Sequence, residues 1–363
     1  MPRLYILLKK LMKNNTEKIS NNSFFEIADN LLKKKQSFFC SRFPGSKKLS
    51  LSSGTITQIN RSEIKGNGIY VMPFNEKNLG FMLNPSINYE TIIEKKLNSI
   101  TNNSLCVEDF VNSEDKENYS RSVKSLIKEI DNGKLSKIVF SKKITFNYSN
   151  SNCISFFKNV LDLYKEAFCY LFFTPKEGVW MGASPELLFQ KEKNSISTMA
   201  LAGTKFNISS GWGDKEFSEQ KIVQDEIIES LSPLCTSLSQ GKTETVSAGE
   251  IQHLKTSFKG TTQASTVKLV NALFPSSAIA GYPRKTALQL ISKHESHKRS
   301  FYSGFLGACK SNSSSLFVNL RCISIRDKKI SIYVGSGITK DSNPENEWIE
   351  ILKKAETMLN VIF

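Results

Sequence analysis

Two segments of the sequence place glutamates three residues apart in a helical pattern. The first, KEFSEQKIVQDEI, contains Glu216 and Glu219, and the second, SNPENEWIEILKK, contains Glu347 and Glu350. Residues three and four apart lie on one face of a helix, so each pair presents two carboxylates side by side, and Lys354 falls on the second stripe. Four carboxylates brought together by two helices repel one another unless a cation lies between them.

A hard cation that takes oxygen ligands and keeps positions open for water and substrate suits such a cluster, and Mg²⁺ fits best. The alternative is that each ExxE pair is an ordinary solvated helix face, which is the commoner situation for one pair alone. The pairs therefore indicate a magnesium site if the fold brings the two helices together.

Four further side chains have the chemistry of an active site. Lys137 is flanked by the apolar residues 138–140 of a strand pattern, so desolvation could lower its pKa and make it a base, although an edge lysine that points to water is the commoner case. Glu186 follows a proline at a strand start, where burial could keep it protonated as an acid. Arg321 lies in the apolar run FVNLRCIS and needs an anionic partner, either a structural carboxylate or a substrate. His253 is one of only 3 histidines.

A glycine-rich segment precedes the second glutamate helix. Residues 330–334 predict a strand that breaks into Gly335-Ser336-Gly337. Glycines in such a place let backbone N–H groups approach an anion beside a helix N-terminus. The segment lacks the third glycine of a dinucleotide fingerprint and the GK[ST] of a P-loop, so by itself it is more often a turn.

These residues need a framework of helices and strands. Helical spacing of apolar residues predicts helices over 23–35, 117–133, 215–238, 267–273, 284–293 and 344–359. Short apolar runs predict strands over 136–146, 169–174, 178–182, 186–190, 195–203, 315–326 and 329–337. We therefore predict one large α+β domain with mostly antiparallel sheets, in which residues 1–115 are a variable N-terminal part and residues 116–363 the catalytic core.

The composition narrows the classes of function. The 49 Lys and Arg exceed the 34 Asp and Glu, giving a net charge of +15 that could attract nucleic acid, anionic lipid or a small anionic substrate. The sequence contains neither a Lys/Arg tract interleaved with aromatic residues nor the spacing of a zinc finger, so its motifs do not indicate nucleic-acid binding. The 7 cysteines are scattered without CxxC spacing, and the apolar run Leu4–Leu8 is too short for a signal peptide. We expect a soluble cytoplasmic protein without a membrane segment.

Nine segments in order resemble one known family. They are KIVFSKK, WMGASPELLF, MALAGTK, KEFSEQ, HLKTSFKG, AIAGYPRKTA, YSGFLGA, NLRC and VGSGITKDSNPENEWIEILKK. Together they resemble the chorismate-utilising enzymes, which include isochorismate, salicylate, anthranilate and aminodeoxychorismate synthases. The resemblance covers residues 116–363, and the tail KAETMLNVIF is similar to that of siderophore-type isochorismate synthases. It implies the fold of this family, with chorismate as the substrate of a monomer or weak dimer.

The resemblance also implies roles for individual residues. Glu219 and Glu350 would bind Mg²⁺, with Glu216 and Glu347 behind them. Lys137 would activate water, and Glu186 would protonate the departing hydroxyl. The implied substrate-binding residues are Gly203, Thr204, His253, Ala278, Tyr302, Arg321, Gly335 and Lys354.

Three positions distinguish members of the family. Ammonia-using anthranilate synthases lack the lysine found here as Lys137. Aminodeoxychorismate synthases have a nucleophilic lysine at the position of Ala202. Enzymes that eliminate pyruvate tend to have threonine at the position of Ala278. The combination resembles isochorismate synthase, with salicylate synthase as the alternative. Phe274 and Gln220 stand where the family usually has histidine. The sequence leaves open whether isochorismate would serve menaquinone or siderophore biosynthesis.

Overall fold

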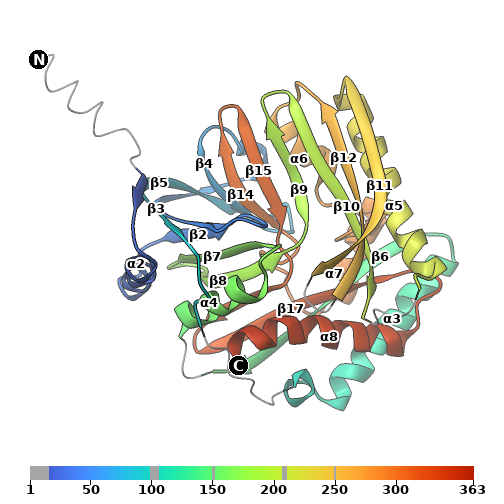
Figure 1. Cartoon of the computed structure of the whole chain (residues 1–363). Helices are drawn as coiled ribbons and strands as arrows, with labels where there is room; N and C mark the ends of the chain where they lie inside the picture. The colour runs from blue at the N-terminus through green and yellow to red at the C-terminus, as the bar shows by residue number, and fades with distance from the viewer. Residues whose placement is uncertain (1–15, 99–105, 149–151, 207–210, 249–250) are drawn as a thin grey trace, which may run out of the picture.

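The computed structural model describes residues 16–98, 106–148, 152–206, 211–248 and 251–363 (Figure 1). The apolar run at Leu4–Leu8 lies outside this part of the chain. The described residues form seven α-helices: α2 (Asn21–Lys33), α3 (Ser113–Asp131), α4 (Cys153–Leu163), α5 (Asp214–Leu231), α6 (Thr266–Leu273), α7 (Arg284–His294) and α8 (Pro344–Ile362). Short 3₁₀ turns are η1 (Arg61–Glu63), η2 (Val107–Phe110) and η3 (Ser232–Leu234).

Seventeen strands are described, and all belong to one sheet. In the N-terminal third they are β1 (Thr16–Lys18), β2 (Phe38–Arg42), β3 (Lys48–Ile59), β4 (Gly68–Met72) and β5 (Gly80–Ile92). The middle contains β6 (Lys137–Asn147), β7 (Phe168–Thr174), β8 (Gly178–Ser184), β9 (Leu187–Glu192), β10 (Ser195–Lys205), β11 (Ser237–Ala248) and β12 (Ile251–Thr261). The last third contains β13 (Gly281–Tyr282), β14 (Phe305–Lys310), β15 (Ser313–Val318), β16 (Cys322–Arg326) and β17 (Lys329–Ile338).

Two series of paired strands diverge from β5. One runs β5–β3–β2–β7–β8–β16–β17–β6–β13, with β1 added to β5 in parallel. The other runs β5–β4–β14–β15–β9–β10–β12–β11. Every pairing except β1–β5 is antiparallel, which confirms the predicted fold class. Because β2 pairs with β7 and β4 with β14, the N-terminal strands share the sheet of the remaining chain.

The core has two parts that follow from this arrangement. An aromatic cluster lies where side chains of the two series meet, with Phe172, Trp180 and Phe301 packed at ring-centroid distances of 5.5–6.4 Å. A larger cluster joins the sheet to the helices. Helix α8 packs along β17 and against α3 and α4, and α5 packs against β10 (Figure 1). The glutamate-bearing helices α5 and α8 thus cover neighbouring parts of one sheet.

Helix α8 confirms its predicted start. The Asn343 side chain accepts hydrogen bonds from the backbone of Glu345 and Asn346, and Pro344 takes the first helical position. Helix α5, by contrast, ends at Leu231, so the predicted helix over 215–238 is too long. Pro233 cannot continue an α-helix, and the chain turns through η3 into β11.

Two strand predictions are wrong in detail. The run over 315–326 forms two strands, because Asn319 between them binds distant groups: it accepts from the Tyr170 hydroxyl and donates to Phe301 O at 2.9 Å. Arg321 therefore lies in the connection, not within a strand. The strand predicted over 329–337 is confirmed as β17, but the predicted break at the glycines is wrong, because the strand continues through residues 335–337 to Ile338, paired with β6. Helix α4 is absent from the predictions, although its apolar residues lie on one face and its polar residues on the other.

Two further observations concern membrane-spanning helices and disulfides. No helix among the described residues is long and apolar enough to cross a membrane. All 7 cysteines are free thiols, and five of them are buried, so none is paired in a disulfide.

Candidate active site

A cavity opens between β10, β12 and β17, beside the start of β6 and the loop before β13. It encloses about 730 Å³ of empty space when its open mouth is counted. Ten of the fourteen predicted site residues line it: Glu186, Gly203, Thr204, Glu219, His253, Ala278, Tyr302, Arg321, Gly335 and Lys354. The other four, Lys137, Glu216, Glu347 and Glu350, lie outside its lining. Ala202, one of the distinguishing positions, also faces the cavity.

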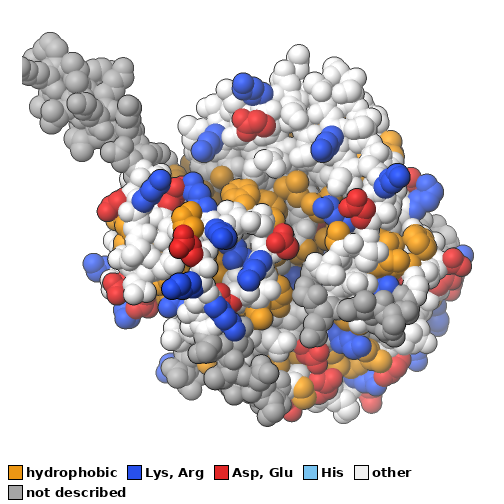
Figure 2. Space-filling view, viewed as in Figure 1, with side chains coloured by type: hydrophobic (Ala, Val, Ile, Leu, Met, Phe, Trp, Pro, Cys, Tyr) orange, Lys and Arg blue, Asp and Glu red, His pale blue; other side chains and the backbone are white. Residues whose placement is uncertain are grey.

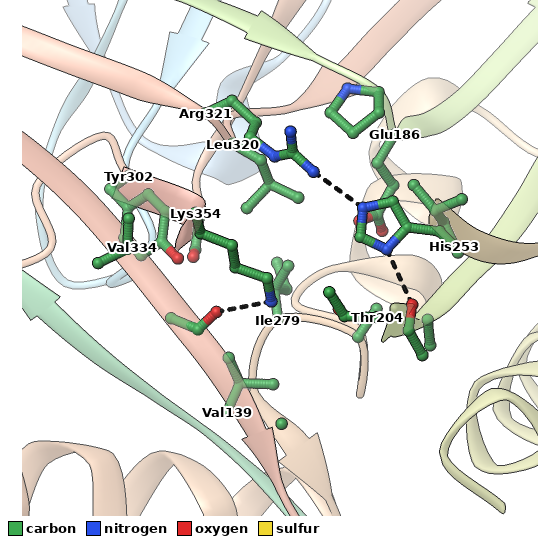
Figure 3. Close-up of a pocket in the computed structure, with 18 of the residues that line it drawn as sticks. Val139, Glu186, Thr204, His253, Ile279, Tyr302, Leu320, Arg321, Val334 and Lys354 are labelled. Carbon is green, nitrogen blue, oxygen red and sulfur yellow. Dashed lines mark hydrogen bonds between the residues drawn. The ribbon is translucent and has the colours of Figure 1, made fainter. Parts of the chain in front are cut away.

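Arg321 and His253 form one hydrogen-bonded unit on the wall (Figure 3). Arg321 has a left-handed backbone with φ +48°, and its Nη2 donates to His253 Nε2 at 2.9 Å. His253 Nδ1 lies 2.8 Å from Gly203 O. Because the guanidinium only donates and the carbonyl only accepts, a neutral ring with its proton on Nδ1 satisfies both partners. Burial, and then the charge of Arg321, lowers the pKa of His253 to about 3, so the ring stays neutral.

A second cation reaches the cavity from α8. Lys354 Nζ donates to Gly335 O at 3.0 Å (Figure 3). It also donates to Glu350 Oε1 at 2.7 Å. Tyr302 closes the wall beside it, and burial raises the pKa of its hydroxyl so that it stays protonated. A Cβ on Gly335 would lie 2.9 Å from the Tyr302 hydroxyl oxygen, so the packing favours glycine there. Arg321 and Lys354 give the cavity two positive groups that suit two carboxylates.

Glu186 lies at the junction of β8 and β9. Its backbone N–H donates to Ser184 Oγ at 3.2 Å, and its carbonyl accepts from Val318 N at 3.0 Å. The residue is only 5% exposed. Burial raises the pKa of Glu186 to about 8, and the positive charge of nearby Lys137 opposes this rise only in part. At neutral pH the carboxyl is mostly protonated and able to donate a proton.

Lys137 is the first residue of β6 and is fully buried. The interpretation of Lys137 as a solvent-facing edge lysine is therefore wrong. Its Nζ lies 2.9 Å from Glu219 Oε1 and has no well-aligned hydrogen-bond acceptor. A Cβ on Gly337 would lie 2.2 Å from Glu219 Oε1 and 3.2 Å from Lys137 Cε. Only glycine at position 337 leaves room for this ion pair.

Three carboxylates from the two glutamate helices gather around one lysine. Glu347 is fully buried and its Oε1 accepts from Lys215 Nζ at 2.5 Å. Burial alone would lower the pKa of Lys215. The negative charges of Glu347, Glu350 and Glu219 outweigh this effect and raise the pKa of the amine. Burial and then Glu350 raise the pKa of Glu347. For Glu219, burial is outweighed by Lys137 and Lys215, which keep its pKa below the usual value.

The chemistry of these donors fits a hard cation. All are carboxylate oxygens, and Glu347 Oε2 is buried without a hydrogen-bond donor. Each of the three carboxylates is instead paired with a lysine, and in the described part of the chain no three acidic, His or Cys side chains already form a metal-binding group. Glu216 points elsewhere: its Oε2 accepts from Gly213 N at 3.0 Å, which caps the start of α5.

Several residues of the site were not found from the sequence. Lys215 begins the KEFSEQ segment, but a lysine at a helix start gives no signal of its own. Leu320 and Tyr333 line the cavity although apolar and aromatic residues in strand patterns usually predict core. Phe274, which replaces a family histidine, packs edge-on against Phe305 with ring centroids 4.8 Å apart and is not part of the cavity lining.

Fold and site together define an α+β protein with a pocket that contains Arg321 and Lys354 and is bordered by a cluster of carboxylates. A model of the chorismate binding enzymes matches residues 76–363. The chain belongs to this family.

Curated relatives agree with this family. Isochorismate synthase MenF of Haemophilus influenzae is 27% identical over 253 residues, covering 66% of this chain and 59% of the relative. Isochorismate synthase EntC of Escherichia coli K12 is 30% identical over 199 residues, covering 51% of each chain. The chain thus spans less than two thirds of the length of these relatives.

Solved structures share the fold over nearly the whole chain. The 2,3-dihydroxybenzoate-specific isochorismate synthase DhbC of Bacillus anthracis matches with a TM-score of 0.79 at 23% identity, covering 93% of this chain and 99% of the other. The menaquinone-specific isochorismate synthase MenF of E. coli gives 0.78 at 21% identity, covering 93% and 91%. Anthranilate synthase component I of Streptococcus pneumoniae gives 0.66 at 17% identity, covering 89% and 90%.

Proposed function

We propose that this protein is an isochorismate synthase that converts chorismate to isochorismate. The observation that carries the proposal is the pairing of a buried lysine with a protonated carboxyl beside a cavity that holds two cations. Lys137 is the buried amine, and Glu186, with a pKa of about 8, is the acid. Relatives named isochorismate synthase support the same reaction.

The reaction moves a hydroxyl group across a conjugated ring. Lys137, as the neutral amine, removes a proton from water, whose oxygen attacks C2 of chorismate. The ring double bonds shift, the C4–O bond breaks, and Glu186 gives its proton to the departing oxygen, which leaves as water. One water is added and one is released, and a proton must return from Lys137 to Glu186 before the next turnover, so atoms and charge balance over the cycle. Each proton transfer supplies roughly 10²- to 10⁴-fold of rate acceleration.

The remaining residues bind and orient the substrate. Arg321 and Lys354 hold the two carboxylates, and the Gly335 backbone lies beside them. His253 keeps Arg321 in place, while Gly203, Thr204, Ala278 and Tyr302 complete the pocket. Mg²⁺ held by Glu219 and Glu350, with Glu216 and Glu347 behind them, would supply positive charge against the ring carboxylate.

Two alternatives make different predictions. Salicylate synthase chemistry would release pyruvate, and the small Ala278 in the cavity wall argues for the isomerase. Nucleic-acid binding would use the charge of +15, yet on the face shown in Figure 2 Lys and Arg side chains are interspersed with Asp and Glu. We further propose a cytoplasmic monomer or weak dimer serving menaquinone or siderophore biosynthesis, with residues 116–363 as the catalytic core.

The first experiment is to incubate purified protein with chorismate, with Mg²⁺ or with EDTA, and to separate the products by chromatography. Isochorismate formed only with Mg²⁺, and no pyruvate, is the expected result. Salicylate with pyruvate would support the alternative within the family. Absence of any product under both conditions would refute the enzymatic proposal.

The base is tested by Lys137→Ala, which should abolish turnover. Lys143→Ala is the matched control, since Lys143 lies on the same strand but is exposed, and its variant should keep wild-type activity. Full turnover by Lys137→Ala would show that another group activates water.

A further inference from the structure

A buried ion pair outside the cavity joins two of its walls. Arg299 and Glu295 follow helix α7, and each side chain is 3% exposed. Arg299 Nε donates to Glu295 Oε2 at 2.9 Å, and Arg299 Nη2 donates to Glu295 Oε1 at 2.6 Å. Neither residue lines the cavity. The reaction proposed above therefore assigns them no part.

The pair fixes three points around the cavity. Arg299 Nη2 donates to Val139 O at 2.7 Å, and Arg299 Nη1 donates to Ile279 O at 2.8 Å. Both carbonyls belong to residues that line the cavity. Glu295 Oε1 accepts from Ser141 N at 2.8 Å and from Ser141 Oγ at 2.7 Å. Two of these points lie on β6, just after Lys137, and one lies on the loop before β13.

The same loop is fastened on its other side to α5. Ser277 N donates to Glu226 Oε2 at 2.6 Å, and Arg284 Nη2 lies 3.2 Å from Glu226 Oε1. Glu226 is on the helix that carries Glu219, two turns further along. The loop that holds Ala278 is thus held between the strand of the proposed base and the helix of its carboxylate partner.

We propose that Arg299 and Glu295 are positioning residues. They hold Lys137 at a fixed position relative to Glu186 and to the loop before β13. The proposal rests on the isochorismate synthase function given above. A buried ion pair seldom adds much stability compared with apolar packing, so stability alone does not account for this pair. The rigid planar fork of arginine reaches a carboxylate and two carbonyls at fixed angles, which a lysine cannot do.

The test is Arg299→Lys, which keeps the charge beside Glu295 but cannot reach both carbonyls. We expect kcat to fall by roughly 10- to 100-fold, as expected for a displacement near 1 Å. We expect KM for chorismate to stay within about threefold, because Arg321 and Lys354 are untouched. Since Lys137 lowers the pKa of Glu186, a displaced β6 should also move the basic limb of the pH–rate profile upward from about 8.

Arg42→Lys is the matched control. Arg42 is equally buried and donates to the carbonyls of Leu161 at 2.6 Å and Tyr164 at 2.7 Å, away from the cavity. This variant should lose thermal stability while its kcat and basic limb match the wild type. A second test variant, Arg299→Met with Glu295→Gln, removes both buried charges at once and should fold while kcat remains low.

The outcomes separate the two proposals. If wild-type protein makes no isochorismate, the proposed function fails. The positioning role is then tested by comparing the pKa of Glu186 in the wild type and the Arg299 variants through pH-dependent unfolding, which needs no substrate. If either Arg299 variant folds with wild-type kcat and an unmoved basic limb, the positioning role is refuted. If neither folds while Arg42→Lys does, the pair is purely structural, and the proposal is again overturned.

Discussion

Replacing Glu186 with glutamine should stabilise the protein at neutral pH while removing its acid. The pKa of Glu186 is raised from 4.5 to about 8 by burial. The folded state therefore binds one more proton than the unfolded state between these two values. The contribution of Glu186 to stability is fully present below about pH 4.5 and is lost as the pH rises toward 8.

The size of the effect follows from the same two pKa values. Between these two pKa values, the contribution of Glu186 to the free energy of unfolding falls by about 1.4 kcal/mol for each pH unit. The loss is therefore on the order of 1 kcal/mol at pH 5.5 and 4 kcal/mol at pH 7.5. Glutamine is of similar size and cannot ionise, so Glu186→Gln escapes this loss. For a chain of 363 residues, a difference of about 3 kcal/mol corresponds to a Tm change of roughly 3–4 °C.

Differential scanning fluorimetry at pH 5.5, 6.5 and 7.5 measures this difference. The Tm of Glu186→Gln should exceed the wild-type Tm by a margin that widens as the pH rises, while kcat is lost at every pH. Glu192→Gln, at an exposed position on the same strand β9, is the control and should show no widening margin. A constant or narrowing margin for Glu186→Gln would mean that Glu186 is ionised at neutral pH and is not the acid.

Two further variants test the carboxylate cluster. Lys215→Met removes the cation shared by three carboxylates. In EDTA the free energy of unfolding of this variant should be lower than that of the wild type by about 2 kcal/mol or more. Mg²⁺ should raise the Tm of the variant more than the Tm of the wild type, and an equal rise would argue against a cation site there. Gly337→Ala should force Glu219 away from Lys137 and lower kcat/KM by roughly 100-fold; wild-type kinetics would show that this ion pair is not needed.

The burial of Lys137 shows where local sequence reasoning stops. The apolar neighbours in KIVF predict a strand correctly, but a lysine in such a strand usually faces water. It is buried here because Glu219, on a helix that begins 77 positions later, supplies the opposite charge. The strand was predictable from its own residues, whereas the burial of the lysine depends on long-range packing.

Helix α8 and the run over 315–326 show the same contrast. The start of α8 is encoded locally, since Asn343 and Pro344 are the capping and first-turn residues that favour a helix. The break at Asn319 has no local signal, because its hydrogen-bonding partners Tyr170 and Phe301 come from distant segments. The family resemblance nevertheless named Arg321 as a site residue, although its predicted setting within a strand was wrong.

Unpaired polar atoms around the cavity suggest how stability and chemistry are divided in this fold. Lys137 Nζ lies 2.9 Å from Glu219 Oε1 without a well-formed hydrogen bond, and Glu347 Oε2 is buried without a donor. A buried polar atom with no partner costs about 1–3 kcal/mol. The aromatic cluster between the two strand series contains neither of these two atoms and gains stability from burial and from ring–ring contacts. We infer that the two atoms lack good partners because these would arrive with the reaction: water at Lys137, and at Glu347 the outer shell of the Mg²⁺ proposed for Glu219 and Glu350.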